Sequence, residues 1–143
     1  MYFKYYYKLT MNRIEISRKY IDELLLNMTD VKERSCAYLY LYGVAQSCVL
    51  IALKRGENAE LSTMAGMLHH IYSYAKIDTN DEETKMICDA IYNHSEKESL
   101  HSEFNEILKD ADVFQHCLYN PMFEMKAHEK NRYEKLKVEF GIA

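Results

Sequence analysis

The chain has 143 residues, of which 48% are hydrophobic and 28% are charged, and its formal net charge is −4. This length suits one domain, and the composition is that of a folded globular protein rather than of a disordered chain. The basic residues form no block, which argues against a nucleic-acid partner, and the single proline and four glycines favour long helices over strands and turns.

The apolar segments and the cysteines indicate a cytoplasmic protein. The longest apolar run, near Ser47 to Leu53, is far shorter than the roughly 20 residues of a membrane-spanning helix, and residues 1–10 lack the order of a secretory signal. None of the four cysteines belongs to a C-x-x-C pair, and all fall within apolar helical patterns. We therefore expect buried, reduced thiols in a reducing compartment, no membrane association and no structural zinc held by these cysteines.

The first ten residues, MYFKYYYKLT, are far richer in tyrosine than the rest of the chain. We interpret residues 1–10 as an N-terminal extension and residues 11–143 as a single helical domain. One hypothesis is that Met11 is the natural start of the protein. The alternative is that the ten residues form an ordered arm that packs on the domain.

Apolar residues recur at helical spacing along almost the whole chain and predict about six helices. The first covers residues 14–28. Asp30 and Glu33 resemble a capping box that opens a second helix, which ends at Gly56. A third helix is expected from Ala59 to about Tyr74.

Three more helices follow. Asn80 can cap the fourth, which runs to His94. The fifth covers residues 104–118. Asn120 and Pro121 fit the cap and first position of a last, highly charged helix over residues 122–140. The predicted fold class is therefore all-α, a single bundle without repeats or linkers.

Polar residues interrupt the apolar stripes at two places. His69 and His70 follow an apolar run near the end of the third helix, and Asp112 lies between Ala111 and Val113 in the fifth. A buried charge is costly unless it is paired, hydrogen-bonded or bound to a metal. Imidazole and carboxylate together suit zinc, manganese or iron.

Three segments resemble the HD-domain metal-dependent phosphohydrolases. AGMLHHIY is similar to the family's A-x-L-H-D-I signature, and ILKDADVFQH is similar to its later L-x-D-A-D segment. YLYGVAQSC resembles the family's first motif, H-x-x-x-V, with Tyr40 and Val44 at the two marked positions. Tyr40 lies 29 residues before His69, a spacing usual in the family.

The resemblance implies an HD-like helical bundle and a divalent metal that activates water for attack on phosphorus. His69 matches the signature histidine and Asp112 the final aspartate, whereas Tyr40 replaces the first histidine and His70 replaces the aspartate of the signature. The expected metal ligands are thus His69, His70 and Asp112, around manganese, iron or zinc. A neutral phenol is a poor ligand, so the metal site is altered and activity can be lost.

Other polar residues are candidates to complete the site. In the resemblance, His94 and Lys97 fall where related enzymes place a second-metal histidine or a phosphate contact, and we assign them catalytic roles. Arg34 and Tyr40 are candidates for binding a phosphate-containing substrate. His101 and His116 are further potential ligands. For each of these residues an ordinary structural role, such as a core histidine or a packing tyrosine, is the alternative.

Three functions remain open at this point. The first is a phosphohydrolase of a small phosphate ester or nucleotide. The second is a catalytically inactive relative that binds a nucleotide or a protein in the old pocket, which the two altered ligand positions favour. The third is a helical interaction module, such as a homodimer formed through the last helix. Fold alone does not choose among them.

Overall fold

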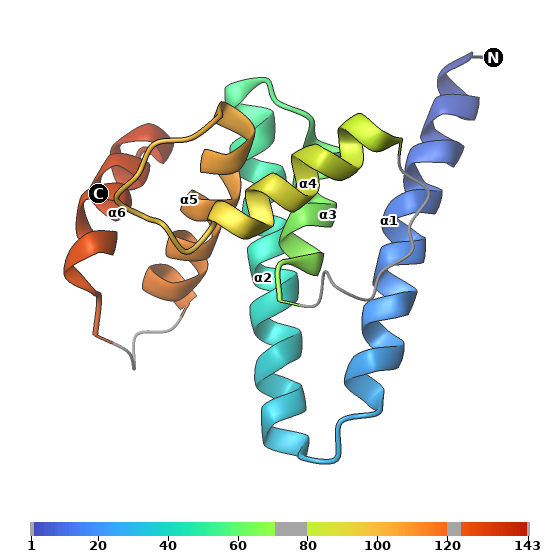
Figure 1. Ribbon diagram of the computed structural model, residues 1–143, viewed down its shortest axis with the longest axis horizontal. Coiled ribbons are helices and arrows are strands. Elements are labelled where there is room, and N and C mark those ends of the chain that lie inside the picture. Colours follow the sequence, from blue (N-terminus) through green and yellow to red (C-terminus); the bar gives the residue numbers. More distant parts are fainter. Residues whose placement is uncertain (1, 71–79, 120–123, 143) are drawn as a thin grey trace.

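The chain folds into six α-helices in the computed structural model (Figure 1), which describes residues 2–70, 80–119 and 124–142, with side chains of 2–12 and 119 excepted. The helices are α1 (Tyr2–Leu26), α2 (Val31–Arg55), α3 (Ala59–Leu68), α4 (Asp81–Asn93), α5 (Glu103–Tyr119) and α6 (Ala127–Phe140). The described part contains no strand. The predicted all-α bundle of about six helices is confirmed.

The two longest helices, α1 and α2, form an antiparallel hairpin along one side of the molecule (Figure 1). The turn between them ends at Asp30, whose side chain accepts hydrogen bonds from the N–H groups of Lys32 and Glu33 and so caps α2. At its other end α2 stops at Gly56, which adopts φ 74°, a left-handed conformation that glycine tolerates without strain.

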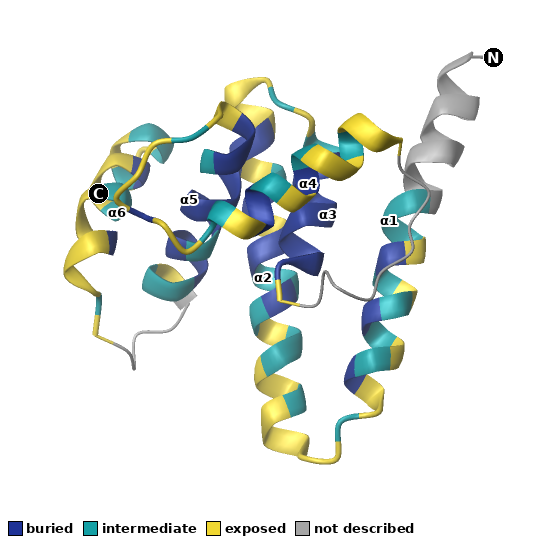
Figure 2. Ribbon diagram, viewed as in Figure 1, coloured by how far each residue is buried: buried dark blue, intermediate teal, exposed yellow. Residues whose placement is uncertain are grey.

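Helix α3 is the central element of the fold. Every residue from Leu61 to Leu68 is buried, because α3 lies against α1, α2, α4 and α5. Figure 2 shows the buried residues gathered where these helices meet. Gly66 allows the close approach: a Cβ there would lie 2.8 Å from the Ala45 Cα atom of α2. The apolar stripes of the sequence therefore converge on one core.

Helices α5 and α6 form the other side of the bundle (Figure 1). The side chain of Leu136 is buried, and the rings of Phe114 and Phe140 meet edge to face with centroids 5.3 Å apart. Arg132 of α6 donates to Glu106 at 2.6 Å and to Asp110 at 2.9 Å on α5. The charged last helix is thus held by a small apolar contact and by ion pairs.

Several local predictions are wrong. The last helix begins at Ala127, with Lys126 as its N-cap residue, and not near residue 122. Helix α3 ends at Leu68, and the rest of the stretch predicted to reach Tyr74 lies outside the described residues from position 71. Helix α1 covers Tyr2–Leu26 and not residues 14–28, while the division into an extension and a domain stays a prediction. Asn120 and Pro121 lie outside the described residues.

The cysteines also differ from the prediction of four buried thiols. Cys48 is buried in the core, Cys117 is half-buried, and Cys36 and Cys88 are exposed; all four are free thiols. Helical periodicity marks one face of a helix, but it does not show whether another helix covers that face. Only Cys48 lies where α3 crosses α2, 3.0 Å from the position of a Cβ on Gly66.

Helix α2 is long and apolar enough to cross a membrane, which the length of its longest apolar run did not predict. Core helices of water-soluble proteins have the same composition, so this property is weak evidence. One face of α2 packs inside the bundle, through the residues Leu41, Val44, Ala45, Ser47, Cys48, Ile51 and Ala52. The cytoplasmic location stays a prediction.

Candidate functional site

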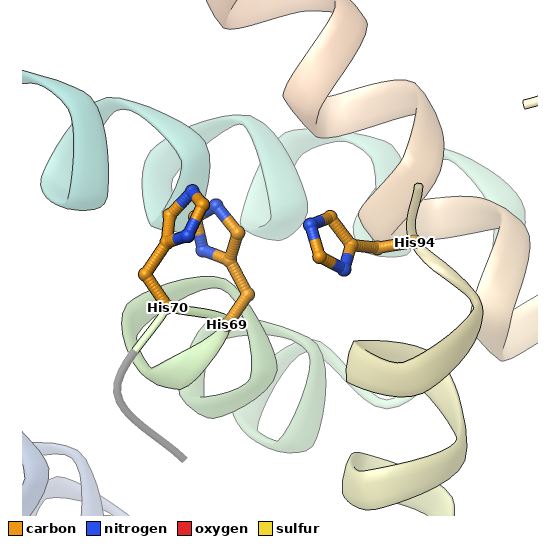
Figure 3. Close-up of side chains that lie close together, drawn as sticks. All are labelled: His69, His70 and His94. Atoms are coloured by element: carbon orange, nitrogen blue, oxygen red, sulfur yellow. The ribbon is translucent and has the colours of Figure 1, made fainter. Parts of the chain in front are cut away.

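The ends of two helices bring three histidines together. His69 is the C-cap residue of α3 and His94 is the C-cap residue of α4, while His70 is the next residue along the chain from His69. Their ring centroids are 4.3 Å apart for His69 and His70, 5.3 Å for His69 and His94, and 5.9 Å for His70 and His94. Figure 3 shows the ring of His94 reaching across from its own helix toward the other two.

His69 is neutral and presents one lone pair to its neighbours. Its Nδ1 atom lies 2.6 Å from the carbonyl oxygen of Gly66, and because a carbonyl only accepts, Nδ1 must carry the proton. The residue is 2% exposed, and burial, followed by the proximity of His70, lowers its pKa to about 3. The deprotonated Nε2 atom is buried and has no hydrogen-bond partner among the described residues.

His94 repeats the arrangement of His69. Its Nδ1 atom lies 2.5 Å from the carbonyl oxygen of Ile91, so its Nε2 atom also carries the lone pair when the ring is neutral. His70 is the exposed member of the group. Partial burial of its ring, and then the nearby His94, lower the pKa of His70.

These three residues meet a geometric requirement of a metal site. One nitrogen from each ring can be chosen so that all three lie within 4.8 Å of one another. Histidine ligands usually donate their second ring N–H to a carbonyl or a carboxylate, which fixes the tautomer and aims the ring. Two of the three rings already make that second hydrogen bond, with Gly66 and Ile91. His69, His70 and His94 therefore form what we call the histidine group.

Asp112 belongs to a second cluster beside the histidine group. One carboxylate oxygen lies 2.6 Å from the ammonium nitrogen of Lys97, and the other accepts a hydrogen bond from the hydroxyl of Tyr40. Lys97 also donates to the carbonyl oxygen of His94 at 2.5 Å, which connects the two clusters. We call Asp112, Lys97 and Tyr40 the aspartate group.

The aspartate group is ionised and internally paired. Burial by itself would raise the pKa of Asp112, but the charge and hydrogen bond of Lys97 and the hydrogen bond of Tyr40 outweigh it, so that the pKa is lowered. Burial and then the charge of Asp112 raise the pKa of Tyr40, so the phenol remains a proton donor. The side chain of Lys97 is only 4% exposed. Asp112 and Lys97 therefore neutralise each other inside the fold.

The histidine group has His94 where the sequence predicted Asp112 beside His69 and His70, and the role of Asp112 as a metal ligand stays a prediction. His69 and His70 are together, as the sequence suggested, but the third histidine is His94. Asp112, expected as a ligand, is engaged by Lys97 and Tyr40. The sequence named Lys97 and His94 as site residues but did not predict the ion pair of Lys97 and Asp112, because nothing in the local pattern shows that a lysine 15 residues away reaches the carboxylate.

The remaining candidates lie elsewhere or have other partners. Arg34 is in the first turn of α2, where its guanidinium contacts the carbonyl oxygen of Met28 at 3.4 Å. The Nδ1 atom of His101 lies 2.6 Å from the ammonium nitrogen of Lys109, and that of His116 lies 2.9 Å from Glu129. These residues do not join the histidine group. The phosphate-binding role predicted for Arg34 stays a prediction.

Comparisons of the chain with protein-family models, with curated proteins and with solved structures found no match.

Proposed function

We propose that this protein is a relative of the HD-domain phosphohydrolases that binds a divalent transition metal through His69, His70 and His94. The observation that carries the proposal is the Nε2 atom of His69, which is buried without a hydrogen-bond partner among the described residues. Leaving such an acceptor unsatisfied costs roughly 1–3 kcal/mol. A metal ion would satisfy it together with the nitrogens of the two neighbouring rings.

The donor set favours particular metals. Three neutral imidazoles without a carboxylate suit zinc and also iron, copper or nickel, whereas manganese prefers oxygen ligands. Three histidines with a further open position are also a known arrangement for catalytic zinc. Of the ions suggested by the sequence, zinc and iron therefore fit this site better than manganese. A bound ion would supply Lewis-acid activation of water at the open position.

The neighbouring residues have roles in the proposed hydrolysis of a small phosphate ester or nucleotide. An ammonium group has three N–H donors, and Lys97 uses two of them for Asp112 and the carbonyl of His94. We assign the third to a phosphate oxygen of the substrate. Asp112 and Tyr40 act as positioning residues, because they hold Lys97 beside the histidine group.

The decisive experiment measures metal content before activity. Tag-free protein is dialysed, and bound metals are determined by elemental mass spectrometry for the wild type, His69→Ala and His128→Ala. His128 is an exposed histidine of α6 and serves as the matched control. We expect His69→Ala to bind one equivalent of zinc or iron less than the wild type, and His128→Ala to bind as much as the wild type. Identical metal content in all three proteins would overturn the proposal.

Activity is tested on the metal-loaded protein with an aryl phosphate diester and a set of nucleoside monophosphates. Turnover that disappears in His69→Ala but persists in His128→Ala supports the hydrolase. Lys97→Met should reduce turnover while metal remains bound, because Lys97 contacts the substrate and not the ion. If the protein binds metal but hydrolyses none of these substrates, the proposed metal site stands and the proposed hydrolase activity is excluded.

A catalytically inactive binding module is the second candidate. The observation in its favour is that Asp112 is neutralised by Lys97 and not available to a metal. This alternative predicts that a nucleotide or inorganic phosphate raises the melting temperature without being hydrolysed. It also predicts that Lys97→Met abolishes this stabilisation by the ligand.

A further inference from the structure

A second cluster of potential metal ligands lies where α6 packs on α5. His116 and Cys117 belong to the last turns of α5, and Glu129 belongs to the first turn of α6. One ligand atom from each residue can be chosen so that the three lie within 4.8 Å of one another. We call these residues the α5–α6 cluster. Two of the potential ligands thus lie on α5 and the third lies on α6.

Glu129 is the most buried residue of this cluster, with 4% exposure. Its carboxylate oxygens lie 2.9 and 3.0 Å from Nδ1 of His116, and one of them accepts the backbone N–H of Lys126 at 3.1 Å. A buried carboxylate needs compensating charge. The imidazole of His116 provides positive charge only when it is protonated.

The half-buried thiol of Cys117 is in the same electrostatic environment. Burial, followed by the negative charges of Glu129 and Asp112, raises the pKa of Cys117 to about 11. The two carboxylates therefore create a negative potential at the sulfur, which favours a cation there. A divalent cation would be attracted by Glu129 and would also stabilise the thiolate form of Cys117.

We propose that His116, Cys117 and Glu129 bind a zinc ion that fastens the first turn of α6 to the end of α5. Nitrogen, sulfur and carboxylate oxygen are the three ligand types of zinc, and the sulfur separates this site from one for magnesium or calcium. The proposal does not depend on the histidine group, with which it shares no residue. It revises the expectation that none of the cysteines holds zinc.

Binding at this site must release protons. The thiol proton of Cys117 passes to solvent when the thiolate forms. If Nδ1 of His116 is the ligand, its proton moves to Nε2 or is also lost to solvent. Zinc affinity should therefore increase with pH, as it does wherever a metal displaces protons from its ligands.

Cobalt(II) provides a test that the histidine group cannot imitate, because only a thiolate ligand gives a sulfur-to-cobalt charge-transfer band in the near ultraviolet. The full-length, metal-free protein is titrated with cobalt(II) at neutral pH. We expect the band to appear, to vanish in Cys117→Ser, and to persist in Cys36→Ser, in which an exposed cysteine is changed. Zinc should displace the cobalt and abolish the band.

The same titration separates this proposal from the first one. In His69→Ala the thiolate band should remain, while the total bound cobalt falls by one equivalent. Glu129→Gln should weaken the thiolate site at least about tenfold, since a charged ligand is lost. A protein that binds cobalt at the histidine group but shows no thiolate band would overturn the α5–α6 site and leave the proposed function standing. A band that survives in Cys117→Ser would overturn it equally.

Discussion

The histidine group and the aspartate group lie side by side, but their polar atoms are satisfied in different ways. Asp112 has a partner for each oxygen, and its charge is balanced by Lys97 within the chain. His69 has a carbonyl partner for one ring nitrogen and none within the described residues for the other. The polar atoms of the aspartate group are thus satisfied within the described part of the chain, whereas the histidine group keeps one buried nitrogen without a partner there. The metal proposal is based on this difference.

This contrast also bears on the proposed relation to the HD-domain phosphohydrolases. In the HD-domain pattern a carboxylate beside histidines helps to hold the metal. Here a lysine occupies the neighbourhood of the carboxylate, and an additional histidine supplies a nitrogen. The buried ammonium of Lys97 balances the charge of Asp112. In the proposed metal site the histidine group would then have no negatively charged ligand, and such a set favours ions that prefer nitrogen.

Removing the ammonium should have the largest effect. Lys97→Met leaves Asp112 largely buried and without its cation, and breaking a buried ion pair from one side costs about 3–5 kcal/mol. We expect a loss of this size in the free energy of unfolding, measured with urea at pH 7. Lys85→Met is the matched control, because the pair of Lys85 and Asp89 is exposed at 75% and 48% and should contribute under about 1 kcal/mol.

A second variant tests whether the unpaired charge of Asp112 causes this loss of stability. Adding Asp112→Asn to Lys97→Met removes the uncompensated charge, so the double variant should recover part of the lost stability. A loss below about 1 kcal/mol in Lys97→Met, well under the range for a broken buried pair, would show that Lys97 is not what balances the charge of Asp112. That result would remove the comparison on which the metal assignment rests.

Acid should act on the histidine group in the metal-free protein. The folded-state pKa of His69 is about 3, well below the value of roughly 6.5 expected in the unfolded chain. The unfolded state therefore binds the extra proton first, so the contribution of His69 to stability is fully present above about pH 6.5 and is lost progressively toward pH 3. Between about pH 8 and pH 5 this amounts to about 2 kcal/mol.

Urea unfolding at the two pH values measures this loss, and His69→Gln is the comparison, because glutamine does not titrate. The wild type should lose more stability on acidification than the variant does. An equal loss in both proteins would mean that the ring of His69 is already protonated in the folded state at the lower pH, contrary to the effect of its burial.

A substitution at Gly66 tests the packing of α3 against α2, which positions the histidine group beside the aspartate group. In Gly66→Ala the new methyl group would lie 2.8 Å from the Cα atom of Ala45 and 3.0 Å from the sulfur of Cys48, and overpacking of this kind costs about 1–3 kcal/mol. The shift of α3 against α2 should also move His69 and weaken metal binding. The control Gly56→Ala has open space around it but a φ of +74°, so it should cost stability, about 1–2 kcal/mol, without affecting metal affinity.

The sequence by itself determined the helical class and many of the helix ends. The caps at Asp30 and Asn80 and the glycine stops at Gly56 and Gly141 follow from residues within a few positions of each other. The start of α6 was placed wrongly, since Asn120–Pro121 is an equally good local signal for a helix that in the structure begins at Ala127. Local sequence rules thus predict that a helix is present better than they predict the residue at which it begins or ends.

The tertiary structure decided which polar groups meet. Tyr40 reaches Asp112 across 72 positions of the chain, and Lys97 reaches it across 15. Such contacts depend on how α2, α4 and α5 pack around α3, and that packing depends on side-chain volumes and on close approaches such as Gly66 against Ala45. Helical periodicity contains no information about the crossing of two helices. For this reason the sequence could propose His69, His70, His94 and Asp112 as site residues, while only the packing places His94 beside the other two histidines and pairs Asp112 with Lys97.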